Sequence, residues 1–194
     1  INAKVEEQEK LYNQTFDQIV EELKAHGIIF LDEKQLNKKQ GDFVQDYFKT
    51  KVIPHLFPIM LKNIINSDAL QDNATYLGVS LKDSSKKKED DYALIMVPSD
   101  VISRFLIIPS DNSNSYIIML DDVMRYCMGE IFGPFGFDLF KAYTIKFTRD
   151  AELDIDNDIS KSFIEQMSDS VKKRKKGAPV RFVYDKDIPE FFLS

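Results

Sequence analysis

The chain has a single cysteine, Cys127, no tryptophan, and only seven glycines and seven prolines among 194 residues. One thiol cannot form an internal disulfide, and this scarcity is typical of a reducing compartment, so we expect a cytoplasmic protein. No apolar run approaches the ~20 residues of a membrane-spanning helix. The sequence therefore predicts no integral membrane segment, and its charged first residues do not match a secretory leader.

Cations are also in the minority: 26 Lys and Arg stand against 32 Asp and Glu, a formal net charge of −6 at pH 7. This balance argues against a general nucleic-acid binder, which presents an excess of cations. Apolar residues make up 43% of the chain, enough for one sizeable core, so we expect residues 1–194 to form a single domain. Both ends look cut, and we expect a piece of a longer protein.

Helical patterns occur at the start of the chain. Apolar residues recur at spacings of three and four over residues 3–26, and Gly27 ends the pattern. Residues 1–27 would then form a leading helix that packs on a missing N-terminal domain. A second helical stretch places Phe43 and Tyr47 on one face, with Phe48 beside them.

Strand patterns dominate the middle of the chain, where two polar runs, KDSSKKKEDD and SDNSNS, predict exposed hairpin connections. A helix is predicted over DDVMRYCMGEIF, capped by Asp121 or Asp122, and another over residues 159–173. The order of elements predicts an α+β fold, a mixed β-sheet with helices packed on it in a three-layer α/β/α-like arrangement, preceded by the long N-terminal helix. The predicted strands are 28–31, 76–81, 92–97, 105–109, 116–120, 143–148 and 180–184.

An acidic corner precedes the last predicted helix. Asp154, Asp156 and Asp158, with Glu165 eleven positions after the first, have the ligand spacing of a calcium loop. The sixth position holds Ile159 where that loop needs glycine, because a β-branched residue disfavours the positive φ of the turn. We therefore predict no metal site. Carboxylates near the first turn of a helix instead stabilise its unpaired N–H groups by ~0.3–1 kcal/mol each.

Five consecutive cations, residues 172–176, end the same predicted helix. One or two cations would complement the unpaired carbonyl groups there, but the others repel one another, so the helix dipole does not account for the whole run. A solvated surface is one interpretation of the run. Contact with an anionic chain is the other.

No catalytic constellation is evident in the sequence. His26 and His55 have no Ser or Cys nucleophile beside them in a recognisable motif, and Cys127 on an apolar helical face is typical of a buried small hydrophobic residue. The glycines from Gly129 to Gly136 fit neither a P-loop nor a dinucleotide fingerprint. We therefore predict no catalytic residue in this chain.

Several blocks of the chain share one family's order: LNKKQGDFVQDYF, DYALIMVPSD, RFLIIPS, YIIMLDDVMRYC, AYTIKFTRDAELDIDNDI and SDSVKKRKKGAPVRFVYDKDIP. The most specific are TRDAELD and the later KKRKKGAPVRFVYD. Through these blocks nearly the whole chain resembles the middle (head) domain of the ATP-dependent polyphosphate kinase family.

The resemblance implies a parent enzyme that reversibly transfers the terminal phosphate of ATP to inorganic polyphosphate, through a phosphohistidine and with Mg²⁺. The family's phospho-accepting histidine belongs to C-terminal domains that resemble phospholipase D, and its adenine contacts to a small N-terminal domain. We therefore expect this chain to be inactive alone. The resemblance also implies a homo-oligomer, with this domain at the subunit contact and along the passage to the active site.

Four cations of this chain are the expected contacts to polyphosphate. Clustered cations favour binding of a polyanion, and this electrostatic attraction weakens as the salt concentration rises. Neutralisation of Arg149 by the neighbouring Asp150 and Glu152 is the alternative for that residue. A free-standing interaction module, whose cationic helix end binds an acidic partner, is the competing function. The expected contact residues are Arg149, Lys172, Arg174 and Lys175.

Overall fold

The computed structural model describes residues 2–63, 71, 73–149 and 179–189. The chain divides into two compact units: unit 1 contains residues 1–54 and 99–128, and unit 2 contains residues 55–98 and 129–194. Each unit is thus assembled from segments that are distant in the sequence. In the described part of the chain, no helix is both long and apolar enough to cross a bilayer.

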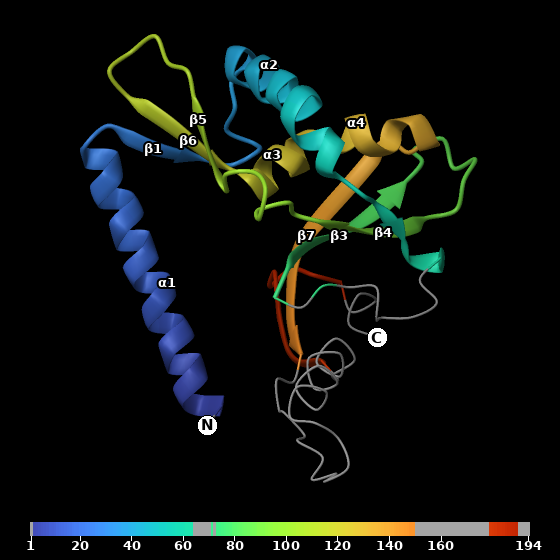
Figure 1. The fold of residues 1–194 in the computed structure, drawn as a ribbon, viewed down its shortest axis with the longest axis horizontal. Coiled ribbons are helices and arrows are strands. Elements are labelled where there is room, and N and C mark those ends of the chain that lie inside the picture. Colours follow the sequence, from blue (N-terminus) through green and yellow to red (C-terminus); the bar gives the residue numbers. More distant parts are fainter. Residues whose placement is uncertain (1, 64–70, 72, 150–178, 190–194) are drawn as a thin grey trace, which may run out of the picture. The chain divides into compact units, whose positions relative to one another are not determined.

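Unit 1 begins with the long helix α1 (Asn2–Ala25), which confirms the predicted leading helix (Figure 1). Gly27 follows it with a φ of +78°, a conformation that glycine adopts without strain. The apolar stripe of α1 is largely uncovered in this chain, since Tyr12, Phe16 and Ile19 are 69%, 37% and 48% exposed.

The sheet of unit 1 has three strands in the order β1-β6-β5. The strands β5 (Phe105–Ile108) and β6 (Ser115–Met119) form the predicted antiparallel hairpin. On the other side of β6, β1 (Ile28–Leu31) runs parallel to it. This sheet is mixed, as the sequence predicted.

Helix α2 (Lys38–Tyr47) starts at a capping box. The Asn37 side chain accepts the Gln40 N–H, and the Gln40 side chain accepts the Asn37 N–H, both at 3.0 Å. This reciprocal pair satisfies two N–H groups that have no partner inside the helix. The helix continues into a π-helical turn, η1 (Phe48–Val52).

The buried face of α2 and η1 is formed by Val44, Phe48 and Val52, all with 0% exposure. The sequence pattern had placed Phe43 and Tyr47 on the principal face, but both are only half-buried. The buried face is thus offset by one residue from the face that the sequence pattern marked, and the offset is already present at Val44 within α2.

Two short helices, α3 (Leu120–Tyr126) and α4 (Met128–Phe132), replace the single predicted helix and are separated at Cys127. The predicted cap is wrong, because Met119 occupies the cap position without a side-chain hydrogen bond and both aspartates lie inside the first turn. Strand β6 runs directly into α3, and the Leu120 N–H donates to the Arg104 carbonyl at 2.8 Å. A capping side chain is therefore not needed at this N–H.

Unit 2 is built on a five-stranded antiparallel sheet in the order β2-β4-β3-β7-β8. Its central strands bury Leu77, Val79, Leu81, Ala93 and Ile95 on one face, each with 0% exposure. A smaller apolar cluster around Tyr76 and Leu94 covers part of the other face. The strands are β2 (Ile59–Met60), β3 (Thr75–Lys82), β4 (Asp91–Met96), β7 (Leu139–Arg149) and β8 (Pro179–Tyr184).

The predicted α+β class is confirmed, although the strands are divided between two sheets. The two sheets correspond to the two units, because β1, β5 and β6 belong to unit 1 and the other five strands belong to unit 2. The three-layer arrangement and the single domain stay predictions, and the helix expected at 159–173 lies outside the described residues. Three 3-10 turns complete the described elements: η2 (Ile53–His55), η3 (Leu61–Asn63) and η5 (Gly133–Phe135).

Candidate functional site

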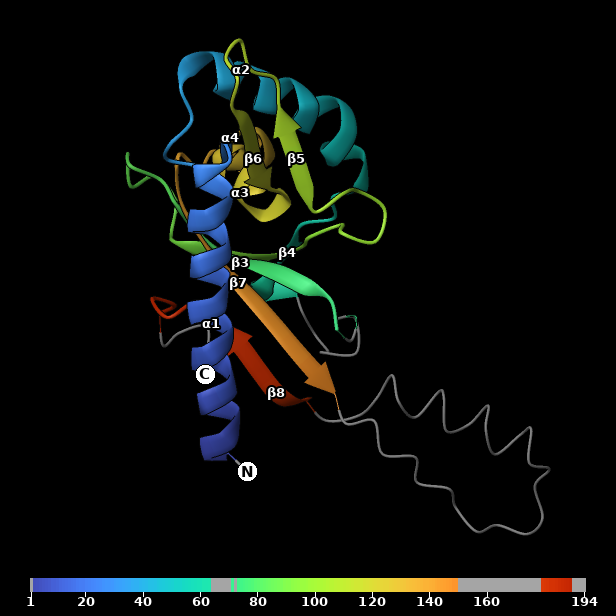
Figure 2. The ribbon, with the colours of Figure 1, turned by 90° about the vertical axis from the view of Figure 1, so that its left-hand side faces the viewer.

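Strands β7 and β8 form a two-stranded ribbon at one edge of the five-stranded sheet of unit 2 (Figure 2). Arg149, the described member of the expected contact set, is the last residue of β7, and its register partner is Pro179, the first residue of β8. The register shifts between Thr148 and Arg149, and such irregularities increase the local twist and redirect the residues beside them. Arg149 and Pro179 are thus paired although residues 150–178 lie between them in the sequence.

The other expected contacts, Lys172, Arg174 and Lys175, lie outside the described residues, as does the acidic corner. Their distance along the chain is nevertheless known, because Lys176 precedes Pro179 by three residues, a reach of at most ~10 Å of extended chain. Since Pro179 pairs with Arg149, the end of the cationic run is tied to the end of β7 by backbone pairing.

Lys146 is an exposed cation on the same ribbon, and the sequence analysis did not select it. Its register partner across the ribbon is Val183, which is 46% exposed. The neighbouring carboxylate of Asp185 accepts the Thr144 N–H at 2.7 Å. Among the described residues, the Lys146 ammonium makes no hydrogen bond or ion pair.

The connection between β3 and β4 is the exposed hairpin loop that the sequence predicted, and Asp83 holds its backbone. The Asp83 carboxylate accepts the backbone N–H groups of Ser85, Lys87 and Lys88 at 2.8, 2.9 and 3.1 Å. Its hydrogen bond to the Ser85 hydroxyl, helped by these N–H groups, lowers the pKa of Asp83. An aspartate followed by serines is a local signal for such a turn.

The same connection is anchored to the segment before β7. The Asp138 carboxylate accepts both the N–H and the hydroxyl of Ser84. Lys88 donates to the Phe135 carbonyl, and its ammonium lies 5.5 Å from the centroid of the Phe137 ring. Because the Lys88 ammonium makes both contacts, this cation stabilises the conformation of the loop.

A pocket of about 700 Å³ opens in unit 2 beside this loop. Met60, Phe135 and Phe137 contribute apolar walls, and Lys62, Lys88 and Asp91 contribute charges. Lys62 is paired with Asp91 at 2.5 Å. Because its two cations are already bound to a carboxylate and a carbonyl, the pocket does not favour a phosphate ligand.

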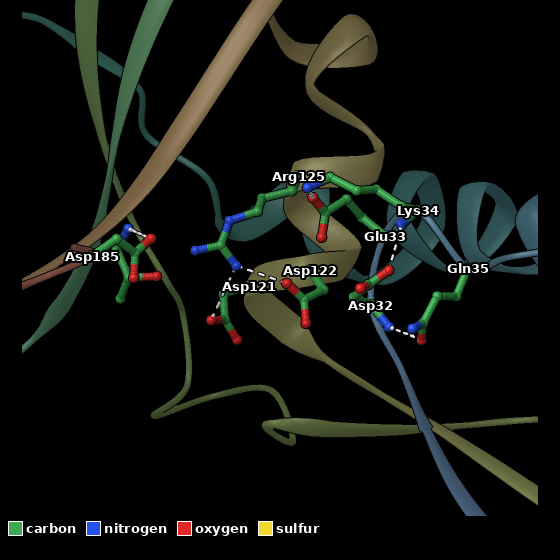
Figure 3. A network of polar contacts seen from close by, with 9 residues as sticks. Asp32, Glu33, Lys34, Gln35, Asp121, Asp122, Arg125 and Asp185 are labelled. Carbon is green, nitrogen blue, oxygen red and sulfur yellow. Dashed lines mark hydrogen bonds and ion pairs between the residues drawn. The ribbon is translucent and has the colours of Figure 1, made fainter. Parts of the chain in front are cut away.

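Unit 1 contains a buried group of charges at the start of α3 (Figure 3). Arg125 donates to Asp122 at 2.7 Å and more weakly to Asp121 at 3.4 Å. Burial and the neighbouring Asp121 raise the pKa of Asp122 to about 6, outweighing the opposite effect of Arg125. One oxygen of Asp121, Oδ1, is buried without a hydrogen-bond partner among the described residues. Acids outnumber cations here, so this group would repel a phosphate chain.

The three residues that the sequence excluded as catalytic lie in three different segments of the chain. His26 and His55 are exposed, at the end of α1 and in the turn η2, while Cys127 is buried at 1% exposure, as predicted. In the part of the chain that the structure describes, no three His, Cys, Asp or Glu residues could hold a metal ion together. The described residues thus form two packed units, and the β7–β8 ribbon of unit 2 carries exposed cations.

A comparison with known families assigns this domain. Residues 39–194 match the family described as the polyphosphate kinase middle domain. The chain belongs to this family, which confirms the resemblance inferred from its sequence blocks.

Similar proteins extend the assignment along the whole chain. Polyphosphate kinases of Vibrio parahaemolyticus and Escherichia coli K12 are each 34% identical to it over 198 and 202 residues, covering 100% of this chain and 28% of each relative. The crystal structure of polyphosphate kinase from Porphyromonas gingivalis has a TM-score of 0.74 and 26% identity, covering 97% of this chain and 26% of that one. The chain therefore spans little more than a quarter of these relatives.

Proposed function

We propose that this chain is the non-catalytic middle domain of an enzyme that reversibly transfers the terminal phosphate of ATP to inorganic polyphosphate. The phosphohistidine lies outside residues 1–194, and ATP and Mg²⁺ act in other domains of the parent. The observation that carries this proposal is that the chain aligns with polyphosphate kinases along its full length while covering 28% of them.

Within the parent, the domain supports the subunit contact of a cytoplasmic homo-oligomer and one wall of the passage for polyphosphate and ATP. Its packed sheets suit such a role, because a supporting domain must hold its surface groups in place against the charge of the substrate. Sedimentation of the intact protein, with and without substitutions in exposed apolar residues of this domain, measures the subunit contact directly.

The leading helix is proposed to pack on a domain that precedes it. The support is the apolar stripe of α1, whose Tyr12 and Ile19 are 69% and 48% exposed in this chain. Burial of such side chains contributes roughly 25 cal/mol for each Å² removed from water. A polypeptide that includes the preceding residues should therefore melt at a higher temperature, and Tyr12→Ala should reduce that gain.

The cationic run and Arg149 are proposed to contact the polyphosphate chain. The support is the pairing of Arg149 with Pro179, which ties the end of the run to the end of β7. The contact residues of this proposal are Arg149, Lys172, Arg174 and Lys175.

The proposed function is tested with ATP labelled at its terminal phosphate. The intact protein should form acid-stable polyphosphate and a covalent phosphohistidine, whereas residues 1–194 alone should acquire no label. Covalent label on residues 1–194 themselves would show that the phosphate-accepting residue lies within this chain, contrary to the proposal. Absence of polyphosphate synthesis by the intact protein, together with binding of residues 1–194 to an acidic protein, would favour the interaction module.

A further inference from the structure

We propose that one face of the β7–β8 ribbon binds inorganic polyphosphate, with Lys146 and the residue at register position 181 as its contacts. This inference rests on the proposed function and adds a surface to it that the cationic run does not include. It follows from three observations: the charges of the two strands, their register, and the surroundings of Lys146.

The first observation is that the ribbon contains cations and no carboxylates. Strand β7 carries Lys141, Lys146 and Arg149, and strand β8 carries Arg181, with no Asp or Glu on either strand. This occurs in a chain whose net charge is −6. A local excess of cations against the overall sign is the electrostatic pattern of an anion-binding surface.

The second observation is the register between the strands. Lys146 lies opposite Val183, and Thr148 lies opposite Arg181. Residues directly opposite share a face, so positions 146 and 181 are diagonal neighbours on one face, typically ~7–8 Å apart. Long side chains at such diagonal positions can reach each other, so an anion that binds there can contact both positions.

The third observation is that the Lys146 ammonium has no partner among the residues that the structure describes. Lys146 is exposed and has no hydrogen bond or ion pair with any described residue. On the same face, the carboxylate of Asp185 accepts the Thr144 N–H at 2.7 Å. The described acid nearest in register is therefore engaged with the backbone rather than with Lys146.

A linear polyphosphate fits these observations because it carries roughly one negative charge per phosphate along a flexible chain. It can reach two diagonal cations on one face, and the release of counterions from the polyanion favours binding. The surface also continues toward Arg149, the last residue of the same strand, where the register shifts. The ribbon would thus hold a stretch of the chain outside the catalytic centre.

The ribbon offers its own control residue. Lys141 lies on the same strand and is also exposed, but its position is five residues from Lys146, on the opposite face, with Ser80 as its partner on β3. If only the net charge mattered, Lys141→Gln and Lys146→Gln would weaken polyphosphate binding equally. If the proposed face binds polyphosphate, only Lys146→Gln weakens it.

The experiment uses the intact polypeptide and long-chain inorganic polyphosphate, with affinity measured between about 50 and 200 mM salt, the range in which counterion release is large. Lys146→Gln and Arg181→Gln should each weaken binding about fivefold and reduce the slope of log affinity against log salt by about 0.7–0.9. Lys146→Arg and Lys141→Gln should bind as the unaltered protein does. In phosphate transfer from polyphosphate to ADP, KM for polyphosphate should rise while kcat is unchanged.

Thermal melting of each variant separates loss of contact from loss of fold. The variants at the exposed residues Lys141 and Lys146 should melt within about 1–2 °C of the unaltered protein. Affinity and salt slope of Lys146→Gln equal to those of Lys141→Gln would overturn the inference, even with phosphate transfer intact. An intact protein that makes no polyphosphate from ATP would refute the proposed function instead, whatever the affinities.

Discussion

Arg149 and Pro179 are register partners across β7 and β8, although residues 150–178 separate them in the sequence. Antiparallel strands are usually joined by short turns, so a pairing across so long a connection is decided by the sheet rather than by a local turn signal. The cationic run, residues 172–176, precedes Pro179 by a few residues in the sequence. Its proposed role in binding polyphosphate can therefore be tested by charge.

Reversal of the cationic run should weaken polyphosphate binding by the intact protein. Replacement of Lys172, Arg174 and Lys175 by Glu removes three cations and adds three anions, so affinity should fall by more than about a hundredfold at low salt, and synthesised chains should be shorter. Gel analysis of the products and titration with polyphosphate measure the two effects. Lys38→Glu, an exposed change at the start of α2, is the control. Unchanged affinity and chain length in the triple variant would show that the run is a solvated surface.

The stability of the isolated chain should depend on pH through Asp122. Its pKa is raised from 3.8 to about 6 in the folded state, so the folded state holds this proton more tightly than the unfolded chain does. The resulting stabilisation is complete below pH 3.8 and is lost as the pH rises through about 6. The contribution to the slope of the unfolding free energy cannot exceed about 1.4 kcal/mol per pH unit for one proton.

Urea unfolding of Asp122→Asn between pH 4 and 7 measures this contribution, and the variant should show a flatter profile than the unaltered chain. The comparison variant is Asp42→Asn, an exposed change on α2, which should leave the profile as it is. If Asp122→Asn and the unaltered chain have parallel profiles, burial does not raise the pKa of this carboxyl group.

Truncation of Phe48 should be strongly destabilising. Its side chain has 0% exposure and lies between Val44 and Val52 on the buried face of α2 and η1. Phe48→Ala should reduce the free energy of unfolding by about 3–5 kcal/mol, because it removes apolar contacts and leaves a cavity. Phe57→Ala, at a position that is 74% exposed, should cost less than about 1 kcal/mol. Similar urea midpoints for the two variants would contradict this assignment of the core.

Gly41 is required by its contact with Tyr126. A Cβ at Gly41 would lie 2.1 Å from the Tyr126 hydroxyl oxygen and 2.9 Å from the ring carbon that carries it. Gly41→Ala should therefore destabilise the chain by about 1–3 kcal/mol through overpacking. Tyr126→Phe removes the closer atom, so the double variant should recover part of the loss. A double-mutant cycle with a coupling energy near zero would exclude this contact as the cause.

Local patterns predicted much of this fold. The leading helix, the first strand and the two hairpins were predicted because their signals lie within a few residues, such as the apolar spacing of α1 and the polar runs between β3 and β4 and between β5 and β6. The cap of α3 failed for the opposite reason. The N–H of Leu120 is satisfied by Arg104, a partner that no pattern around Asp121 reveals.

The candidate site shows the same division. The sequence led to the prediction of Arg149 and the cationic run as contacts, because clustered charge is visible along the chain. It did not identify Lys146, whose nearest sequence neighbours are apolar or neutral and whose relation to position 181 exists only through the register of β7 and β8.

The amino-acid order alone established the family, the α+β class and the absence of a recognisable catalytic motif, since these depend on short-range spacing and on blocks of residues that stay together. Tertiary structure alone decided how the strands divide into two sheets, which face of α2 is buried, and which cations share a face of the ribbon. The physical reason is that strand pairing and burial join residues far apart along the chain, and their free energies depend on neighbours that the local sequence does not name.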